Sequence, residues 1–232
     1  MKRAVLCLVA VLFAASVAKA NSVLSGALTV DNQFVAYLST SPTVQGTQIA
    51  SGNNWMSAVA IAPTQLTWGT TYYLQIDAQN WQRDPQTGQP YTPETNPGAL
   101  LGSFTLAGGQ HLFSNGSANL LTNTANWTYS YAGFGTAAMV PIGEGLNGTN
   151  IWGSVLGGSF AGISSSAQWI WDPTVPETNG SWTYYSYSAT DLFFETEITP
   201  APGVTPEPGS LFLLGSGLTA LAGFIARRRR SA

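Results

Sequence analysis

The residues best suited to bind a ligand lie in one stretch, residues 81–96, which reads WQRDPQTGQPYTPETN. It places the aromatic side chains of Trp81 and Tyr91 near the charged side chains of Arg83 and Asp84. A sugar can stack its apolar face on an aromatic ring while its hydroxyls bond polar groups, and long loops inside compact domains are often functional. We therefore predict Trp81, Arg83, Asp84 and Tyr91 as ligand-binding residues. The alternative is a flexible surface loop in which Arg83 and Asp84 form a solvated pair.

A second set of candidates consists of oxygen donors. Asp31-Asn32 is expected to open a strand, and Ca²⁺ takes six or more oxygen ligands of this kind. Glu195 and Glu197 share one face of an expected strand and Asp172 ends another, so these carboxylates could converge. Their spacing matches no known calcium loop. The favoured interpretation is therefore that Asp31-Asn32 belongs to a turn and that the other carboxylates lie at a solvent-facing strand edge. No metal or other cofactor is therefore predicted.

Catalytic constellations are scarce. His111 is the only histidine, so a Ser-His-Asp triad would depend on it, yet Gly109-Gln110-His111 reads as an ordinary turn. The sequence contains no Gly-x-Ser-x-Gly, phosphate-binding or His-Glu-x-x-His motif. We predict that the protein is not an enzyme and has no catalytic residues. A glycoside hydrolase needs only two carboxylates and remains the third choice.

Short strands are expected to position these residues, because apolar and polar residues alternate in several runs and no run has a helical period. Trp127, Trp169 and Trp171 are expected in the core, and Trp55, Trp81 and Trp152 in the core or at its rim. The prediction is an all-β protein, a single antiparallel β-sandwich or jelly roll over residues 21–199, followed by a Pro-rich spacer at 200–205. Strands are expected at residues 33–39, 55–62, 71–80, 99–107, 126–132, 168–171, 181–187 and 191–199.

Both ends of the chain read as targeting signals. Residues 1–20 combine a basic start, an apolar run and the small residues Ala18 and Ala20, which is typical of a signal peptide cleaved after Ala20. Residues 210–226 carry no charge and would form a transmembrane helix about 25 Å long. The arginines that follow, at positions 227–230, would keep its end in the cytoplasm.

The body between these signals is acidic. Residues 21–205 hold ten acidic residues and one cation, Arg83, so their net charge is −9, compared with −3 for the whole chain. Such a body has no positively charged surface on which nucleic acid could bind. The single cysteine, Cys7, lies in the expected signal peptide, so the body has neither a disulfide nor a thiolate metal site.

The tail resembles a known sorting signal. Pro206-Glu207-Pro208, the apolar helix and then Arg227, Arg228, Arg229 and Arg230 stand in the order of the PEP-CTERM signal of Gram-negative bacteria that make extracellular polysaccharide. This resemblance covers roughly the last 29 residues, and the sorting signal itself is placed at residues 206–232. It implies that an exosortase, a transpeptidase-like membrane enzyme, processes the chain near the triplet. Signal peptidase is the second expected processing enzyme, and it would act after Ala20. The resemblance also implies a precursor anchored in the inner membrane with its body in the periplasm, delivered afterwards to the cell surface or extracellular matrix.

The body is similar to galactose-binding-like β-sandwich modules that accompany many glycoside hydrolases and lectins. The matching stretches are Val30-Asp31-Asn32-Gln33-Phe34, Pro97-Gly98-Ala99-Leu100 and Ala167-Gln168-Trp169-Ile170-Trp171, together with a strand that ends in Asn80. The chain departs from the pattern at Ser39-Thr40-Ser41-Pro42 and by the insertion at residues 81–96. The resemblance implies a non-catalytic protein that binds carbohydrate or exopolysaccharide. The competing expectation is a structural matrix component without a specific ligand.

Overall fold

The computed structural model describes residues 21–81, 83–84, 86–89, 97–173, 176–179, 182–185, 191–202 and residue 217. The expected signal peptide and, apart from Gly217, the expected C-terminal helix with its arginines lie outside these ranges. Within the described ranges, no helix is both long and apolar enough to cross a membrane. Residues Asn21–Ala201 form one unit, and the fold described below is that of this unit.

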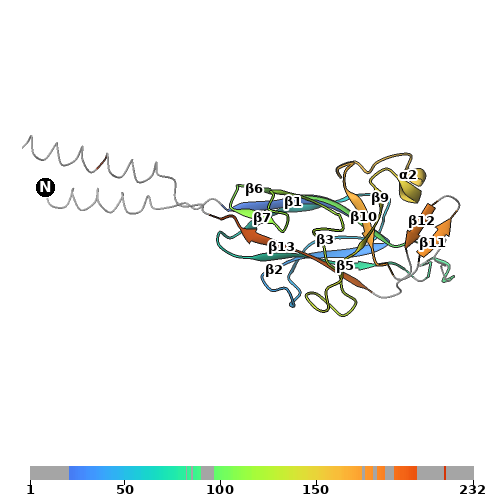
Figure 1. Ribbon diagram of the computed structural model, residues 1–232, viewed down its shortest axis with the longest axis horizontal. Helices are drawn as coiled ribbons and strands as arrows, with labels where there is room; N and C mark the ends of the chain where they lie inside the picture. Colours follow the sequence, from blue (N-terminus) through green and yellow to red (C-terminus); the bar gives the residue numbers. More distant parts are fainter. Residues whose placement is uncertain are drawn as a thin grey trace, which may run out of the picture. The chain divides into compact units, whose positions relative to one another are not determined.

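Two antiparallel sheets face each other in this unit (Figure 1). The first sheet has the order β4-β1-β6-β10-β9, with β8 paired to β6, and the second has the order β3-β2-β5-β13-β7. A separate hairpin is formed by β11 and β12. The strands of the first sheet are β1 (Ser22–Asp31), β4 (Val59–Leu66), β6 (Ala99–Ala107), β8 (Asn119–Leu121), β9 (Ile142–Leu146) and β10 (Gln168–Trp171). Those of the second are β2 (Gln33–Ser39), β3 (Thr47–Gly52), β5 (Tyr72–Gln79), β7 (His111–Phe113) and β13 (Leu192–Pro200), and the hairpin is β11 (Pro176–Asn179) with β12 (Trp182–Tyr185). The expectation of an all-β body with antiparallel sheets is confirmed.

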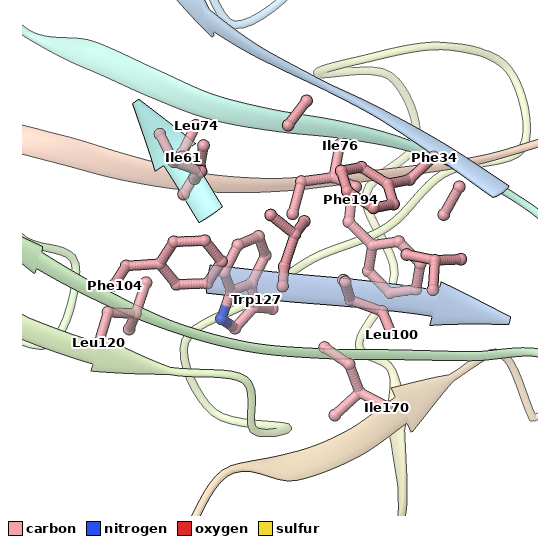
Figure 2. Packing of buried hydrophobic residues seen from close by; sticks show 14 of the residues in the cluster. Phe34, Ile61, Leu74, Ile76, Leu100, Phe104, Leu120, Trp127, Ile170 and Phe194 are labelled. Atoms are coloured by element: carbon pink, nitrogen blue, oxygen red, sulfur yellow. The ribbon is translucent and has the colours of Figure 1, made fainter. Parts of the chain in front are cut away.

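The space between the sheets is filled by one apolar cluster (Figure 2). Alternation along the strands produces it: in β5, Leu74, Ile76 and Ala78 point inward, while Tyr73 and Asp77 point outward. Full burial of a leucine or phenylalanine side chain contributes about 1.5–3 kcal/mol relative to exposure. The core also takes in Trp127 and Trp171, as the sequence predicts.

A second apolar cluster covers the outer face of the first sheet. Trp152, on the short helix α2 (Asn150–Leu156), stacks on Trp169 of β10 with ring centroids 4.5 Å apart. Phe160 meets the edge of the same Trp169 ring. This layer excludes water from the part of the outer face around Ala99, Leu101 and Trp169, so that part of the first sheet is buried on both sides. The predicted burial of Trp169 is confirmed, and Trp152 belongs to the core.

The outer face of the second sheet is covered by loops rather than by a helix. Phe134 packs edge-on against Tyr37 of β2 and Phe193 of β13. The buried side chain of Gln75 on β5 donates to the carbonyl of Ser41 and accepts from the N–H of Gly46. One part of this face, beside β13, stays open and is described below.

Several strand predictions differ from the structure. β4 begins at Val59 rather than Trp55 and continues through Pro63, which is tolerated because β4 is an edge strand that needs no N–H at that position. Residues 126–132 form no strand and contribute only the bridges Thr128–Glu195 and Tyr129–Met139.

The Asp31-Asn32 pair does not open a strand, which corrects the expectation. Asp31 is the last residue of β1 in the first sheet, and β2 in the second sheet starts at Gln33. Asn32 is therefore the corner at which the chain crosses between the sheets.

The two ends of the sandwich are occupied by different parts of the chain. At one end, called the terminal end, the N–H of Gln110 donates to Ser22 Oγ, and the N–H of Ala201 donates to the carbonyl of Gln110. At the other, called the distal end, Asp31 pairs with Ala99 and Leu192 pairs with Ala78. A strand rises about 3.3 Å per residue, so the length of β13 separates the two ends by about 26 Å.

Candidate functional site

The loop predicted to bind a ligand starts at the distal end. Asn80 is buried directly after β5, and the N–H of Trp81 donates to Asn32 Oδ1 at 2.7 Å. Asn32 Nδ2 donates in turn to Asp31 Oδ1 at 2.6 Å. The corner between the sheets thus fixes the first residue of the loop, and Trp81 is half-buried there.

The two charged residues of the loop stabilise a local turn. Asp84 Oδ1 accepts from the backbone N–H groups of Gln86 at 2.7 Å and Thr87 at 3.1 Å. These hydrogen bonds, the one from Gln86 first, hold the pKa of Asp84 below its ordinary value. Arg83 Nη1 donates to the carbonyl of Gly88 at 3.0 Å. The hydrogen bonds of this turn join Arg83 and Asp84 to residues 86–88, whereas Tyr91 lies outside the described residues.

A buried carboxyl is linked to the start of this loop through Asn32. Asp31 is almost fully buried, and its Oδ2 accepts from Trp152 Nε1 at 3.0 Å. Burial raises the pKa of Asp31 to about 7, and the hydrogen bonds from Trp152 and Asn32 oppose this rise. The position of Trp152 on α2 could not be inferred from local sequence, because the two partners are 121 positions apart.

The carboxylates considered for calcium do not converge. Asp31 lies on the outer face of the first sheet, against Trp152, whereas Glu195 and Glu197 lie on the outer face of the second sheet. Asp172 is buried after β10. Among the residues that the structure describes, no group of three or more His, Cys, Asp or Glu side chains is arranged to hold a metal ion.

Two further acids lie near the distal end of the second sheet. Asp191, just before β13, accepts through Oδ1 from Gln79 Nε2 at 2.7 Å. Burial and then the charge of Asp191 raise the pKa of Asp77 to about 6. The acidic character seen in the sequence is therefore partly concentrated at this end.

His111 is buried at the terminal end, where it begins β7 instead of forming the expected turn. Its Nε2 lies 3.0 Å from the carbonyl oxygen of Thr70, and its ring meets that of Tyr72 edge-on. Its hydrogen-bond partner is a backbone carbonyl rather than the carboxylate that a Ser-His-Asp triad requires.

A cleft that local sequence analysis did not identify lies on the outer face of the second sheet. It has a volume of about 320 Å³, and its polar lining includes Tyr73 from β5, Ser114, Asn126 and Thr128 from loops, and Glu195 and Glu197 from β13. The signal available in the sequence was the shared strand face of the two glutamates, which the structure confirms. Their neighbours come from three distant parts of the chain, so the cavity itself had no local signature.

Comparison with known proteins identifies the tail. Residues 204–230 match the PEP-CTERM protein-sorting motif. No curated protein and no solved structure matches this chain. The motif marks the chain as an exported protein that passes a membrane and is processed by an exosortase-type enzyme, and it assigns no ligand to the β-sandwich that it follows.

Proposed function

We propose that the chain is a non-catalytic surface or matrix protein whose β-sandwich binds carbohydrate through the Trp81 loop at its distal end. The observation that carries this proposal is the position of that loop. Both the N-terminal strand and the strand that leads into the sorting motif meet at the terminal end, through Ser22, Gln110 and Ala201. Trp81 stands at the opposite end of the sandwich, away from the end of β13 that leads into the sorting motif.

The chemistry of the loop supports a saccharide ligand. Trp81 provides a half-buried indole ring at the rim of the sandwich, and the apolar face of a sugar can stack on a ring of this kind. The hydrogen bond from its N–H to Asn32 fixes the backbone at this residue, which lowers the entropy lost on binding. In this proposal, Arg83, Asp84 and Tyr91 supply hydrogen-bonding partners around the ring.

The charge of the body restricts the class of glycan. With ten acids and one cation between residues 21 and 205, the body repels acidic polysaccharides at low ionic strength. Neutral glycans are therefore the first ligands to test on the Trp81 loop.

The test is a titration of the full-length protein, purified in detergent, against a panel of neutral glycans. The proposal predicts saturable binding that Trp81→Ala reduces at least about tenfold, which corresponds to about 1.4 kcal/mol. Trp68→Ala is the matched control, because Trp68 is the same residue type and lies exposed in the β4–β5 turn at the terminal end. No binding by the folded wild-type protein to any glycan would favour the structural matrix component instead.

A further inference from the structure

The cleft beside β13 (the β13 cleft) exists because the second sheet is interrupted there. On the far side of β13 from β5, the segment around Thr128 exchanges backbone hydrogen bonds with Glu195, while β7 pairs only with Ile198–Pro200. Glu197 lies between these two partners, and its carbonyl accepts from the N–H of Ser114 at 2.9 Å. The β13 cleft lies beside this change of partner, next to Thr196 and Glu197.

The walls of the β13 cleft are held in place by hydrogen bonds. Asn123 Oδ1 accepts from the N–H groups of Ala125 and Asn126, both at 2.9 Å, and so fixes the loop that forms one wall. Ser114 Oγ lies 3.0 Å from Thr196 Oγ1 and donates to the carbonyl of Asn126 at 3.3 Å. The cavity is therefore formed before any ligand arrives, which favours binding.

The β13 cleft is rich in unused acceptors. Glu195 Oε2 accepts from Gln75 Nε2 at 3.0 Å, and Glu197 Oε1 accepts from the Tyr73 hydroxyl at 3.4 Å. The second oxygen of each carboxylate, Oε1 of Glu195 and Oε2 of Glu197, has no hydrogen bond from the described residues. Both existing donors are neutral, and the one cation of the body, Arg83, belongs to the loop at the distal end.

The electrostatics favour a positively charged group. Burial and the neighbouring charge of Glu197 raise the pKa of Glu195, against the hydrogen bond from Gln75. A cation placed between the carboxylates relieves their repulsion, whereas an acidic sugar increases it. Bare Ca²⁺ is a poor fit because it requires six or more oxygens. A ligand that carries both an ammonium group and several hydroxyls matches the carboxylates together with the hydroxyl and amide groups of Thr128, Ser114 and Asn126.

We propose that the β13 cleft binds an amino-bearing sugar unit of a partly deacetylated glycan, with its ammonium group between Glu195 and Glu197. The exposed side chain of Val140 provides an apolar contact at the rim for the sugar ring. This inference rests on the proposed carbohydrate binding, and it adds a second site with a different class of sugar. The β13 cleft lies on the outer face of the second sheet, whereas the Trp81 loop lies at the distal end. One polysaccharide held at both sites would bind with higher avidity than at either site alone.

The test compares two tetrasaccharides that differ only in acetylation, tetraglucosamine and tetra-N-acetylglucosamine, by calorimetry on the full-length protein in detergent at pH 6. We expect tetraglucosamine to bind at least about tenfold more tightly, about 1.4 kcal/mol, with affinity that falls as salt is added. Glu195→Gln and Glu197→Gln should each reduce this affinity about tenfold, because the amide keeps the acceptor for Gln75 or Tyr73 and loses the charge. A thermal melt of each variant checks that it is folded.

Asp191→Asn is the matched control, since it removes a carboxylate just before β13, outside the lining of the β13 cleft. The inference predicts that it leaves the affinity for tetraglucosamine unchanged. An equal loss in Asp191→Asn would show that net charge alone attracts the ligand, and equal binding of tetralysine would show that no sugar is recognised. Either result overturns the inference, as does calcium binding that depends on Glu195 and Glu197 without any sugar.

The two proposals fail in different ways. Loss of neutral-glycan binding in Trp81→Ala, combined with no preference for tetraglucosamine, would leave the proposed function standing and refute the β13 cleft. Binding of tetraglucosamine that needs Glu197 but not Trp81, with no neutral-glycan binding, would support the cleft and refute the role of the Trp81 loop.

Discussion

The terminal end and the distal end of the sandwich are built in different ways. At the terminal end, strands are joined by short turns such as Thr67–Thr70, and the buried His111 bonds a backbone carbonyl. At the distal end, the chain crosses between sheets at Asn32, which joins the start of the Trp81 loop to the buried carboxyl of Asp31. In the function proposed above, the terminal end leads into the sorting motif and the distal end binds the ligand.

The largest effect expected from this comparison concerns the tryptophans. Trp152→Ala should lower the free energy of unfolding by about 3–5 kcal/mol, because it removes the ring stacked on Trp169 and the hydrogen bond to Asp31. Trp68→Ala, at the partly exposed turn of the terminal end, should lower it by less than Trp152→Ala does. Denaturant unfolding of both variants measures the difference, and equal losses would show that the distal layer is not part of the cooperative core.

The buried carboxyl predicts a pH dependence of stability. The pKa of Asp31 is about 7 in the folded protein against an ordinary value of 3.8, so between these pH values the folded state holds a proton that the unfolded state has lost. Stability from this group therefore falls as pH rises through this window, by at most about 4 kcal/mol at 1.36 kcal/mol per pKa unit. Asp77, whose pKa is raised to about 6, adds a smaller slope of the same sign.

Urea unfolding at pH 5 and pH 8 tests this dependence. Asp31→Asn should flatten most of the slope, since an amide does not titrate. Asp84→Asn is the control: hydrogen bonds hold the pKa of Asp84 below its ordinary value of 3.8, so this group stays charged from pH 5 to pH 8 and its replacement should leave the slope unchanged. A wild-type protein that is equally stable at both pH values would contradict the buried, neutral state of Asp31.

Much of the fold could be predicted from local patterns. The predicted bounds of β2, β6 and β10 agree with the structure, and those of β5 differ by one residue at each end. These strands were predictable because apolar and polar residues alternate along them, or because they form a short apolar run between turn residues. β1 was not predicted, since it is covered on both faces over much of its length and mixes small and polar residues. One of these, Gly26, has no room for a side chain, because a Cβ there would lie 2.5 Å from the carbonyl oxygen of Ser103.

The prediction failed where tertiary contacts replace local periodicity. Trp127, Tyr129 and Tyr131 alternate as in a strand, yet Trp127 and Tyr129 enter the core from a loop that makes only isolated bridges. The same limit applies to the candidate sites. The residues around Trp81 are neighbours in sequence and were found from it, whereas the contact of Trp152 with Asp31 and the lining of the β13 cleft depend on residues far apart along the chain.

The most direct test of the distal end as the ligand-binding end is hydrogen exchange on the full-length protein, with and without a neutral glycan that binds it. We predict slower exchange at residues 79–89, where the Trp81 loop leaves β5, and unchanged exchange at residues 105–113 of the terminal end. The protection should disappear in Trp81→Ala and persist in Trp68→Ala. Protection confined to the terminal end, or protection at residues 79–89 that survives in Trp81→Ala, would contradict the assignment of ligand binding to this loop.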